Sequence, residues 1–170
     1  MTSLGGRFSG TGIYAGRSQL SHYVEELGKV IGNLQSLELI LRFYLLKHEG
    51  APMLSSHLDT VTVGDVVPKN ALTDYRSLGQ LLDAYNERVG PQDALQAEEI
   101  VRLRDALAHG RLLARQPGPP FRLLKFSDPK KGPIKIEIDE SIDRSWLATK
   151  KALVNTAMEK VGSGSWRNDR

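Results

Sequence analysis

The fold of this chain is decided by its longest periodic stretch, SQLSHYVEELGKVIGNLQSLELILRFYLLKH (Ser18–His48). Its apolar residues recur every three or four positions, which is the spacing of one face of an α-helix. Ser18 is suited to the N-cap, so the pattern predicts one long helix over residues 18–48. Between Leu37 and Leu46 apolar residues cover most of the circumference. That widening indicates either the central helix of a bundle or a helix buried in a dimer.

The rest of the chain adds three predicted helices and one predicted hairpin. Residues 134–138 alternate strictly between apolar and charged side chains and pair in the prediction with residues 123–126, across a turn that contains Pro and Gly. We therefore predict a mainly α fold, a four-helix bundle with a β-hairpin inserted before the last helix. The three further helices are expected over residues 74–89, 91–113, and from Ser141 or Asp143 to Val161.

A length of 170 residues fits one domain with its own core. Residues 1–17 are rich in Gly and Ser, so we expect a flexible leader there. The single domain is expected over residues 18–161, and residues 162–170 are expected to form a frayed tail.

The composition excludes several classes of function. There is no cysteine, which excludes a disulfide framework and a thiolate metal site. The four histidines are widely separated and no His-Glu-x-x-His spacing occurs, so we predict no metal and no cofactor. No apolar run approaches the length of a membrane span. We expect a soluble, cytoplasmic protein without a membrane partner.

The richest group of chemical side chains is Arg-Asp-Ala-Leu-Ala-His-Gly-Arg, residues 104–111, late in the third predicted helix. Asp105 and His109 are four positions apart, so they face each other on a helix. A carboxylate in that place can hold an imidazole and favour its charged form. Arg104 adds a fixed positive charge beside the pair, which suits a phosphodiester. Gly110 either frees His109 to reach a substrate or simply ends the helix.

This segment resembles the core motif of the HEPN superfamily, an Arg, a polar residue and then a His within a few positions. Three other pairs satisfy the bare spacing (Arg17–His22, Arg42–His48 and Arg102–His109), but only Arg104 is followed by an acidic residue. The resemblance implies an all-helical bundle, usually dimeric, with the motifs of both subunits at the dimer interface. It also implies metal-independent ribonuclease chemistry in many members and nucleotide binding or protein contacts in others.

Cations are concentrated around the motif. Arg102, Arg111 and Arg115 are the expected substrate-binding residues, because a basic cluster suits an anionic partner such as RNA. The alternative is a solvated helix end whose cations offset the helix dipole.

Two hypotheses follow. In the first, the chain is a HEPN-like endoribonuclease of the toxin or defence type, a homodimer in which Arg104, Asp105 and His109 are catalytic and the ribose 2′-OH attacks the phosphate. In the second, it is a non-catalytic HEPN-like module that binds a nucleotide or a partner protein. An antitoxin or a nucleotidyltransferase is a further expected partner of such a chain.

Overall fold

The computed structural model describes residues 11–50, 61–114 and 120–165. Its spine is α1 (Thr11–His48), a helix of 38 residues and therefore about 57 Å long. The long predicted helix is confirmed, but it begins at Thr11, seven residues before the predicted start. None of the helices in the described part of the chain is both long and apolar enough to cross a membrane.

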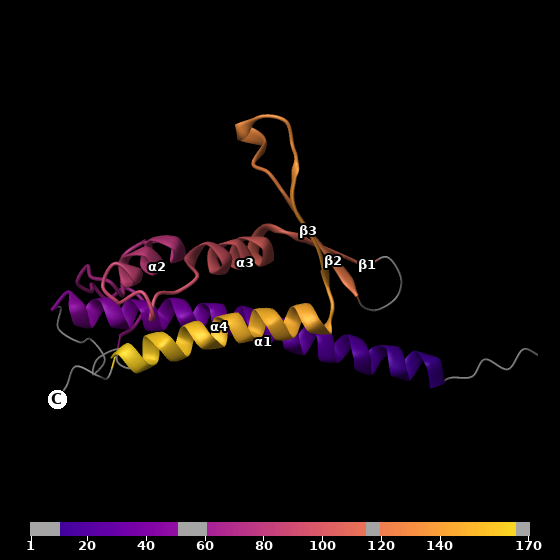
Figure 1. The fold of residues 1–170 in the computed structure, drawn as a ribbon, viewed down its shortest axis with the longest axis horizontal. Coiled ribbons are helices and arrows are strands. Elements are labelled where there is room, and N and C mark those ends of the chain that lie inside the picture. The colour runs from indigo at the N-terminus through magenta and orange to yellow at the C-terminus, as the bar shows by residue number, and fades with distance from the viewer. Residues whose placement is uncertain (1–10, 51–60, 115–119, 166–170) are drawn as a thin grey trace, which may run out of the picture.

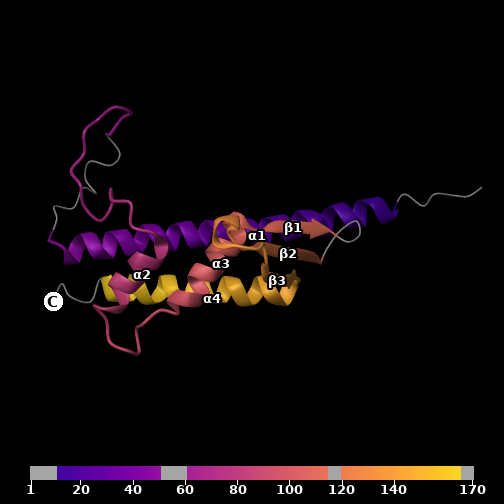
Figure 2. The ribbon, with the colours of Figure 1, turned by 90° about the horizontal axis from the view of Figure 1, so that it is seen from above.

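The last helix, α4 (Arg144–Ser165), runs alongside α1 in the same direction (Figures 1 and 2). The amide of Asn33 donates to the side-chain oxygen of Asn155 at 2.7 Å, and Lys151 forms an ion pair with Glu26 farther along the contact. These polar contacts lie beside an apolar seam, so they set the register of two helices that apolar burial holds together.

Two shorter helices lie over both α1 and α4 (Figures 1 and 2). α2 (Leu78–Asn86) begins with a capping box, in which Ser77 accepts from the backbone of Gln80 and the Gln80 side chain accepts from the backbone of Ser77. α3 (Ala97–His109) follows. Both helices are shorter than the predicted 74–89 and 91–113. The segment before α3 is instead held in turns, because the Asn86 side chain bonds both backbone groups of Leu95.

The predicted mainly α, four-helix bundle is wrong. Within the described residues there are four helices, as predicted, but the chain also forms an antiparallel sheet of three strands, so the fold is mixed α and β. The strands are β1 (Arg111–Ala114), β2 (Phe121–Phe126) and β3 (Ile136–Ile142), in the order β1-β2-β3. β2 and β3 correspond to the predicted hairpin, whereas β1 lies in a segment that was predicted to be helical.

Gly110 explains why the third helix stops and β1 begins. Its backbone is extended, with φ −75° and ψ 174°, and a Cβ there would lie 2.3 Å from the Ala106 carbonyl oxygen and 2.6 Å from the Leu123 side chain. Only glycine fits so close to the helix end and the neighbouring strand. The chain therefore turns at Gly110 and pairs with β2, where Leu112 lies opposite Leu123.

The core lies between α1 and the other elements. The wide apolar part of α1 is buried inside this one chain, since Leu37, Leu41, Leu45 and Leu46 have no exposed surface. That burial favours the central helix of a domain over a helix held in a dimer at this point. Residues 61–77, which lead into α2, contain no strand.

The β2–β3 hairpin extends well beyond the body of the molecule (Figure 1). We call residues 125–137 the arm. It includes the end of β2, the short 3-10 helix η2 (Pro129–Lys131) and the start of β3. Exposed apolar side chains occur along it, at Phe126, Ile134 and Ile136.

Candidate functional site

The motif residues all lie on the solvent-facing side of α3, but they do not lie together. Successive residues of an α-helix are about 100° apart, so Arg104 and His109 are separated by about 140° around the axis. Asp105 lies between them. Arg104 and Asp105 are each about one-third exposed, and His109, the last residue of the helix, is exposed.

Asp105 pairs with its neighbour rather than with the imidazole. Its carboxylate oxygen lies 2.8 Å from the Arg104 guanidinium. The expected pairing of Asp105 with His109 is not present, and the His109 side chain has no hydrogen-bond or ion-pair partner among the residues that the structure describes. The imidazole is therefore available to a ligand, but no carboxylate orients it.

His109 lines an open cleft of about 750 Å³ between the end of α3 and the arm. We call it the arm cleft. Its wall includes groups from both sides, among them Asp105, His109, Arg111, Lys125, Phe126 and Ile134. A second cleft of about 540 Å³ adjoins it along α3, shares Asp105 and Lys125, and includes Arg102.

Arg104 lines a different depression. This groove, of about 330 Å³, lies between α1 and α3 and is largely apolar, with Ile31, Leu34 and Leu107 in its wall. Within one copy of the chain, Arg104 and His109 therefore open onto separate spaces. Asp105 connects them only through its ion pair with Arg104.

The basic residues around the motif differ in whether a carboxylate lies beside them. Arg102 lies 3.6 Å from the Glu140 carboxylate, and Arg122 binds Asp139 with two hydrogen bonds. This second contact raises the pKa of Arg122 above its ordinary value, since a carboxylate favours the charged guanidinium. Arg115 lies outside the described residues.

Arg111 is the cation that matters most to the arm cleft. It is exposed, and one guanidinium nitrogen donates to the carbonyl oxygens of His109 at 3.1 Å and Gly110 at 3.3 Å. The C-terminal end of a helix carries a partial negative charge that repels anions. Arg111 covers that end of α3 and so offsets the repulsion just where His109 is placed. Lys125 adds a second positive group, although it pairs with Glu137 at 2.6 Å.

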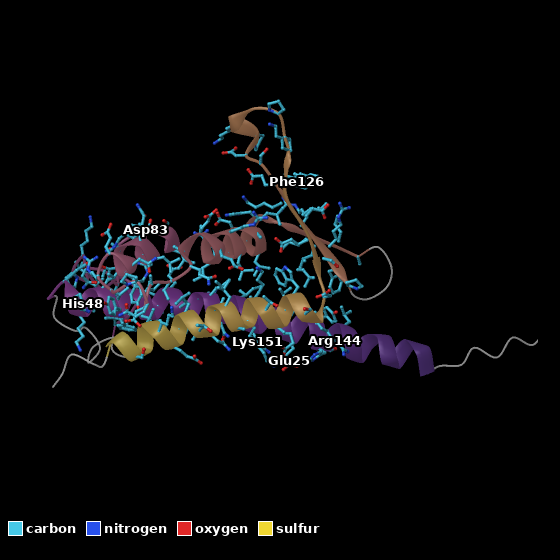
Figure 3. All side chains as sticks on the ribbon, in the orientation of Figure 1. Glu25, His48, Asp83, Phe126, Arg144 and Lys151 are labelled. Carbon is cyan, nitrogen blue, oxygen red and sulfur yellow. The ribbon has the colours of Figure 1, made fainter. Side chains whose placement is uncertain are left out.

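Phe126 is a residue of this cleft that the sequence reasoning did not identify. The sequence predicted it only as the last residue of the first hairpin strand, residues 123–126. In the structure the β2–β3 register shifts between Lys125 and Phe126, and the ring is 44% exposed at the base of the arm (Figure 3). The length of the hairpin could have indicated this exposure, because apolar residues near its tip extend beyond the body of the protein that would bury them.

Comparison with models of protein families, with curated proteins and with solved structures finds no match for this chain. No group of three or more His, Asp or Glu side chains that could hold a metal ion occurs in the described ranges.

Proposed function

We propose that this chain binds single-stranded RNA in the arm cleft and cleaves it without a metal ion, as HEPN-like ribonucleases do. The observation that carries the proposal is the exposed imidazole of His109, which has no hydrogen-bond partner within residues 11–50, 61–114 and 120–165 and shares one cleft with Arg111 and Lys125. Histidine is the side chain that most readily exchanges a proton near neutral pH. Arginine and lysine supply positive charge to a phosphate without losing their own protons at that pH.

The chemistry needs two proton transfers. A base takes the proton of the ribose 2′-OH, the 2′-oxygen bonds to phosphorus, and the 5′-oxygen leaves with a proton from an acid. The products are a 2′,3′-cyclic phosphate and a 5′-hydroxyl. His109 would carry one of these transfers, while Arg111 and Lys125 would stabilise the charge that builds on the phosphate oxygens.

Among the residues that the structure describes, one copy of the chain supplies one imidazole to the arm cleft, so the proposal includes a homodimer. Its surface would be an apolar seam on α1 formed by Leu20, Val24, Leu27 and Ile31. Leu20, Val24 and Ile31 are 41%, 61% and 41% exposed, and Leu27 is partly buried against the core. Successive residues of the seam are four, three and four positions apart, and this spacing is the same whichever end of the helix it is counted from. A second copy running antiparallel would place Leu20 against Ile31 and Val24 against Leu27, as a two-fold contact requires.

RNA cleavage is tested by incubating mixed RNA with the protein in EDTA and identifying the new ends. We expect fragments with 2′,3′-cyclic phosphates, and a loss of about 100-fold or more in rate for His109→Ala. The matched controls are His22→Ala and Arg144→Ala, both exposed and neither in the wall of the cleft. No cleavage by the native chain, or equal cleavage by His109→Ala, would remove the proposal. Arg104→Ala measures whether the second copy's groove takes part.

The dimer is tested by light scattering after size exclusion. We expect twice the 18.8 kDa chain mass for the native protein and the single mass for Val24→Glu, which puts a charge into the apolar contact. Leu39→Glu is the matched control, an exposed apolar residue on α1 outside the seam. A native monomer, or a Leu39→Glu variant that dissociates equally, contradicts the assigned surface.

A second candidate is a non-catalytic module that acts by contacting a protein. It is favoured by the Arg104–Asp105 ion pair within one copy and by the separate grooves of Arg104 and His109. Under this alternative the native protein self-associates through the α1 seam, and RNA remains intact with native and variant chains alike.

A further inference from the structure

The arm carries an aromatic ring without an internal role. Phe126 lies at the base of the arm (Figure 3), 44% exposed, where the β2–β3 register shifts. A buried Phe side chain normally contributes substantially to folding, so an exposed ring on a projecting hairpin gives that contribution up. Leu123 and Leu124, only a few positions earlier on the same strand, are buried.

Resting on the proposed function, we infer that Phe126 is a stacking platform for one unpaired RNA base whose phosphate lies beside His109 and Arg111. Every nucleobase has a flat π-face, and stacking on an exposed aromatic side chain is the usual way in which proteins hold single strands. Phe126 and His109 line the same cleft from opposite walls, one on the arm and one at the end of α3. A single nucleotide presents a base to one wall and a phosphate to the other.

The size of the arm cleft fits this occupant. Its volume of about 750 Å³ lies within the range of about 300–1,000 Å³ that is common for small-ligand sites. Its wall is mixed, with apolar surface from Phe126 and Ile134 and polar surface from Ser127 and the charged groups. An amphipathic nucleotide matches such a wall better than a wholly apolar ligand does.

The charge on the arm also favours a nucleic acid strand. Residues 125–137 contain Lys125, Lys130, Lys131 and Lys135 against Asp128 and Glu137, which leaves an excess of two positive charges. Lysines along a projecting hairpin can follow a phosphate backbone, and their contribution falls as salt rises. A purely protein partner would not require this excess.

The arrangement selects single strands. A base inside a duplex is stacked and paired, so it reaches Phe126 only after it has been pulled out of the helix, which costs free energy. The sequence of the RNA matters little to a bare aromatic face, so the expected selectivity is for unpaired structure rather than for a base.

The test measures binding apart from cleavage. A fluorescent single-stranded RNA with 2′-O-methyl riboses is titrated with the protein in EDTA at low salt, and anisotropy gives Kd. We expect Phe126→Leu, which keeps apolar volume and removes the face, to weaken binding about 5- to 150-fold. Phe126→Trp retains native binding, and Tyr75→Leu leaves it unchanged, because Tyr75 is an exposed aromatic residue that does not line the cleft. A duplex of the same sequence binds more weakly than the single strand.

An abasic position in the oligonucleotide sharpens the test. If one base stacks on Phe126, removing it from the RNA weakens binding to the native chain, and Phe126→Leu adds no further loss for that RNA. Circular dichroism and thermal unfolding confirm that each variant folds.

The outcomes of these binding experiments distinguish the inference about Phe126 from the proposed function. If the native chain cleaves or binds single strands and Phe126→Leu matches it, the inference about Phe126 is wrong and the proposed function stands. If the native chain neither binds nor cleaves RNA, the proposed function itself fails. If Phe126→Leu instead converts a native dimer to a monomer, the ring serves a protein contact and the stacking role is overturned.

Discussion

Arg42 holds the segment between α1 and α2 against the body of the protein, so its removal should have a large and measurable cost. Its guanidinium donates to the carbonyl oxygens of Ala71 at 3.0 Å, Asp74 at 3.2 Å and Arg76 at 2.8 Å. It also lies 3.0 Å from the Asp74 carboxylate and 2.9 Å from that of Glu38. The proposed change is Arg42→Met, which keeps an unbranched apolar stem and removes every one of these donors.

The magnitude follows from the burial of each partner. The Arg42 and Asp74 side chains are 12% and 15% exposed, and removing one member of a buried pair costs about 3–5 kcal/mol. That figure is reduced here because Asp74 keeps a second partner, the Arg76 guanidinium at 2.6 Å. The pair with Glu38, which is 40% exposed, adds only about 0.3–0.5 kcal/mol. We therefore expect a loss of about 2–4 kcal/mol in the free energy of unfolding.

The assay is urea unfolding at pH 7, monitored by circular dichroism. The slope of the free energy of unfolding against urea concentration is compared between variants. The matched control is Arg88→Met, since Arg88 is exposed and donates to the carbonyl of Ala84 at the end of α2. The control should lose less than about 1 kcal/mol. A loss below about 1 kcal/mol for Arg42→Met, or one equal to that of Arg88→Met, would refute the argument that Arg42 anchors this segment.

The same variant has a predicted pH dependence. Burial by itself raises the pKa of Asp74, but hydrogen bonds from Arg76 and Arg42 outweigh it, so the pKa lies below its ordinary value. A carboxyl with a lowered pKa in the folded state stabilises the protein above its unfolded pKa of about 3.9, and this contribution is lost as pH falls through the folded value. The stability difference between the native chain and Arg42→Met should therefore shrink as pH falls below the unfolded pKa of Asp74.

The remaining predictions concern Gly110 and Tyr85. Gly110→Ala puts a Cβ 2.3 Å from the Ala106 carbonyl oxygen and 2.6 Å from the Leu123 side chain. We therefore expect the free energy of unfolding, measured in urea, to fall by about 2–3 kcal/mol. An unchanged stability would contradict this close packing. Tyr85→Phe should leave the free energy of unfolding equal or higher, because the buried Tyr85 hydroxyl has no hydrogen-bond partner among the described residues. A loss of about 1 kcal/mol or more, the net value of one hydrogen bond, would instead show that the hydroxyl has a partner. Burial, together with the nearby Tyr44, raises the pKa of Tyr85 to about 12, so native stability should fall as pH rises from about 10 towards 12, and this fall should diminish in Tyr85→Phe.

Local periodicity predicted the helical part of the fold well. The long helix, α2, α3 and α4 were all expected in the right order, because each carries an apolar stripe that can be read from neighbouring residues alone. The errors were at the ends. α1 begins at Thr11, inside a Gly-containing segment. Glycine disfavours a helix, so the local sequence there predicted a loop instead of the helix that forms.

β1 could not be predicted from its own residues. Arg-Leu-Leu-Ala at residues 111–114 has good helical propensity, and it continues the pattern of the helix before it. It becomes a strand because it pairs with β2, whose residues are about ten positions away, and because Gly110 fits against Leu123. Both causes are tertiary contacts, which a single sequence does not reveal.

The geometry of the motif, by contrast, was partly contained in the sequence. Residues five positions apart on a helix are about 140° apart, so Arg104 and His109 cannot both face one phosphate from a single straight helix. What the spacing could not reveal is that a different arginine, Arg111, lines the cleft of His109. The break at Gly110 turns the chain, and Arg111 comes back over the end of α3 beside His109.

Whether Arg111 or Arg104 faces the phosphate determines what a second copy of the chain must contribute to the site. If Arg111 supplies the charge in the arm cleft, a dimer is needed only for the second proton transfer, and Arg104 is free to hold Asp105 in place. If Arg104 supplies it, the groove of one copy must meet the arm cleft of the other. In the first case we expect Arg111→Ala to abolish cleavage and Arg104→Ala only to slow it. In the second case the order is reversed, so the two rates measured side by side decide which arginine faces the phosphate.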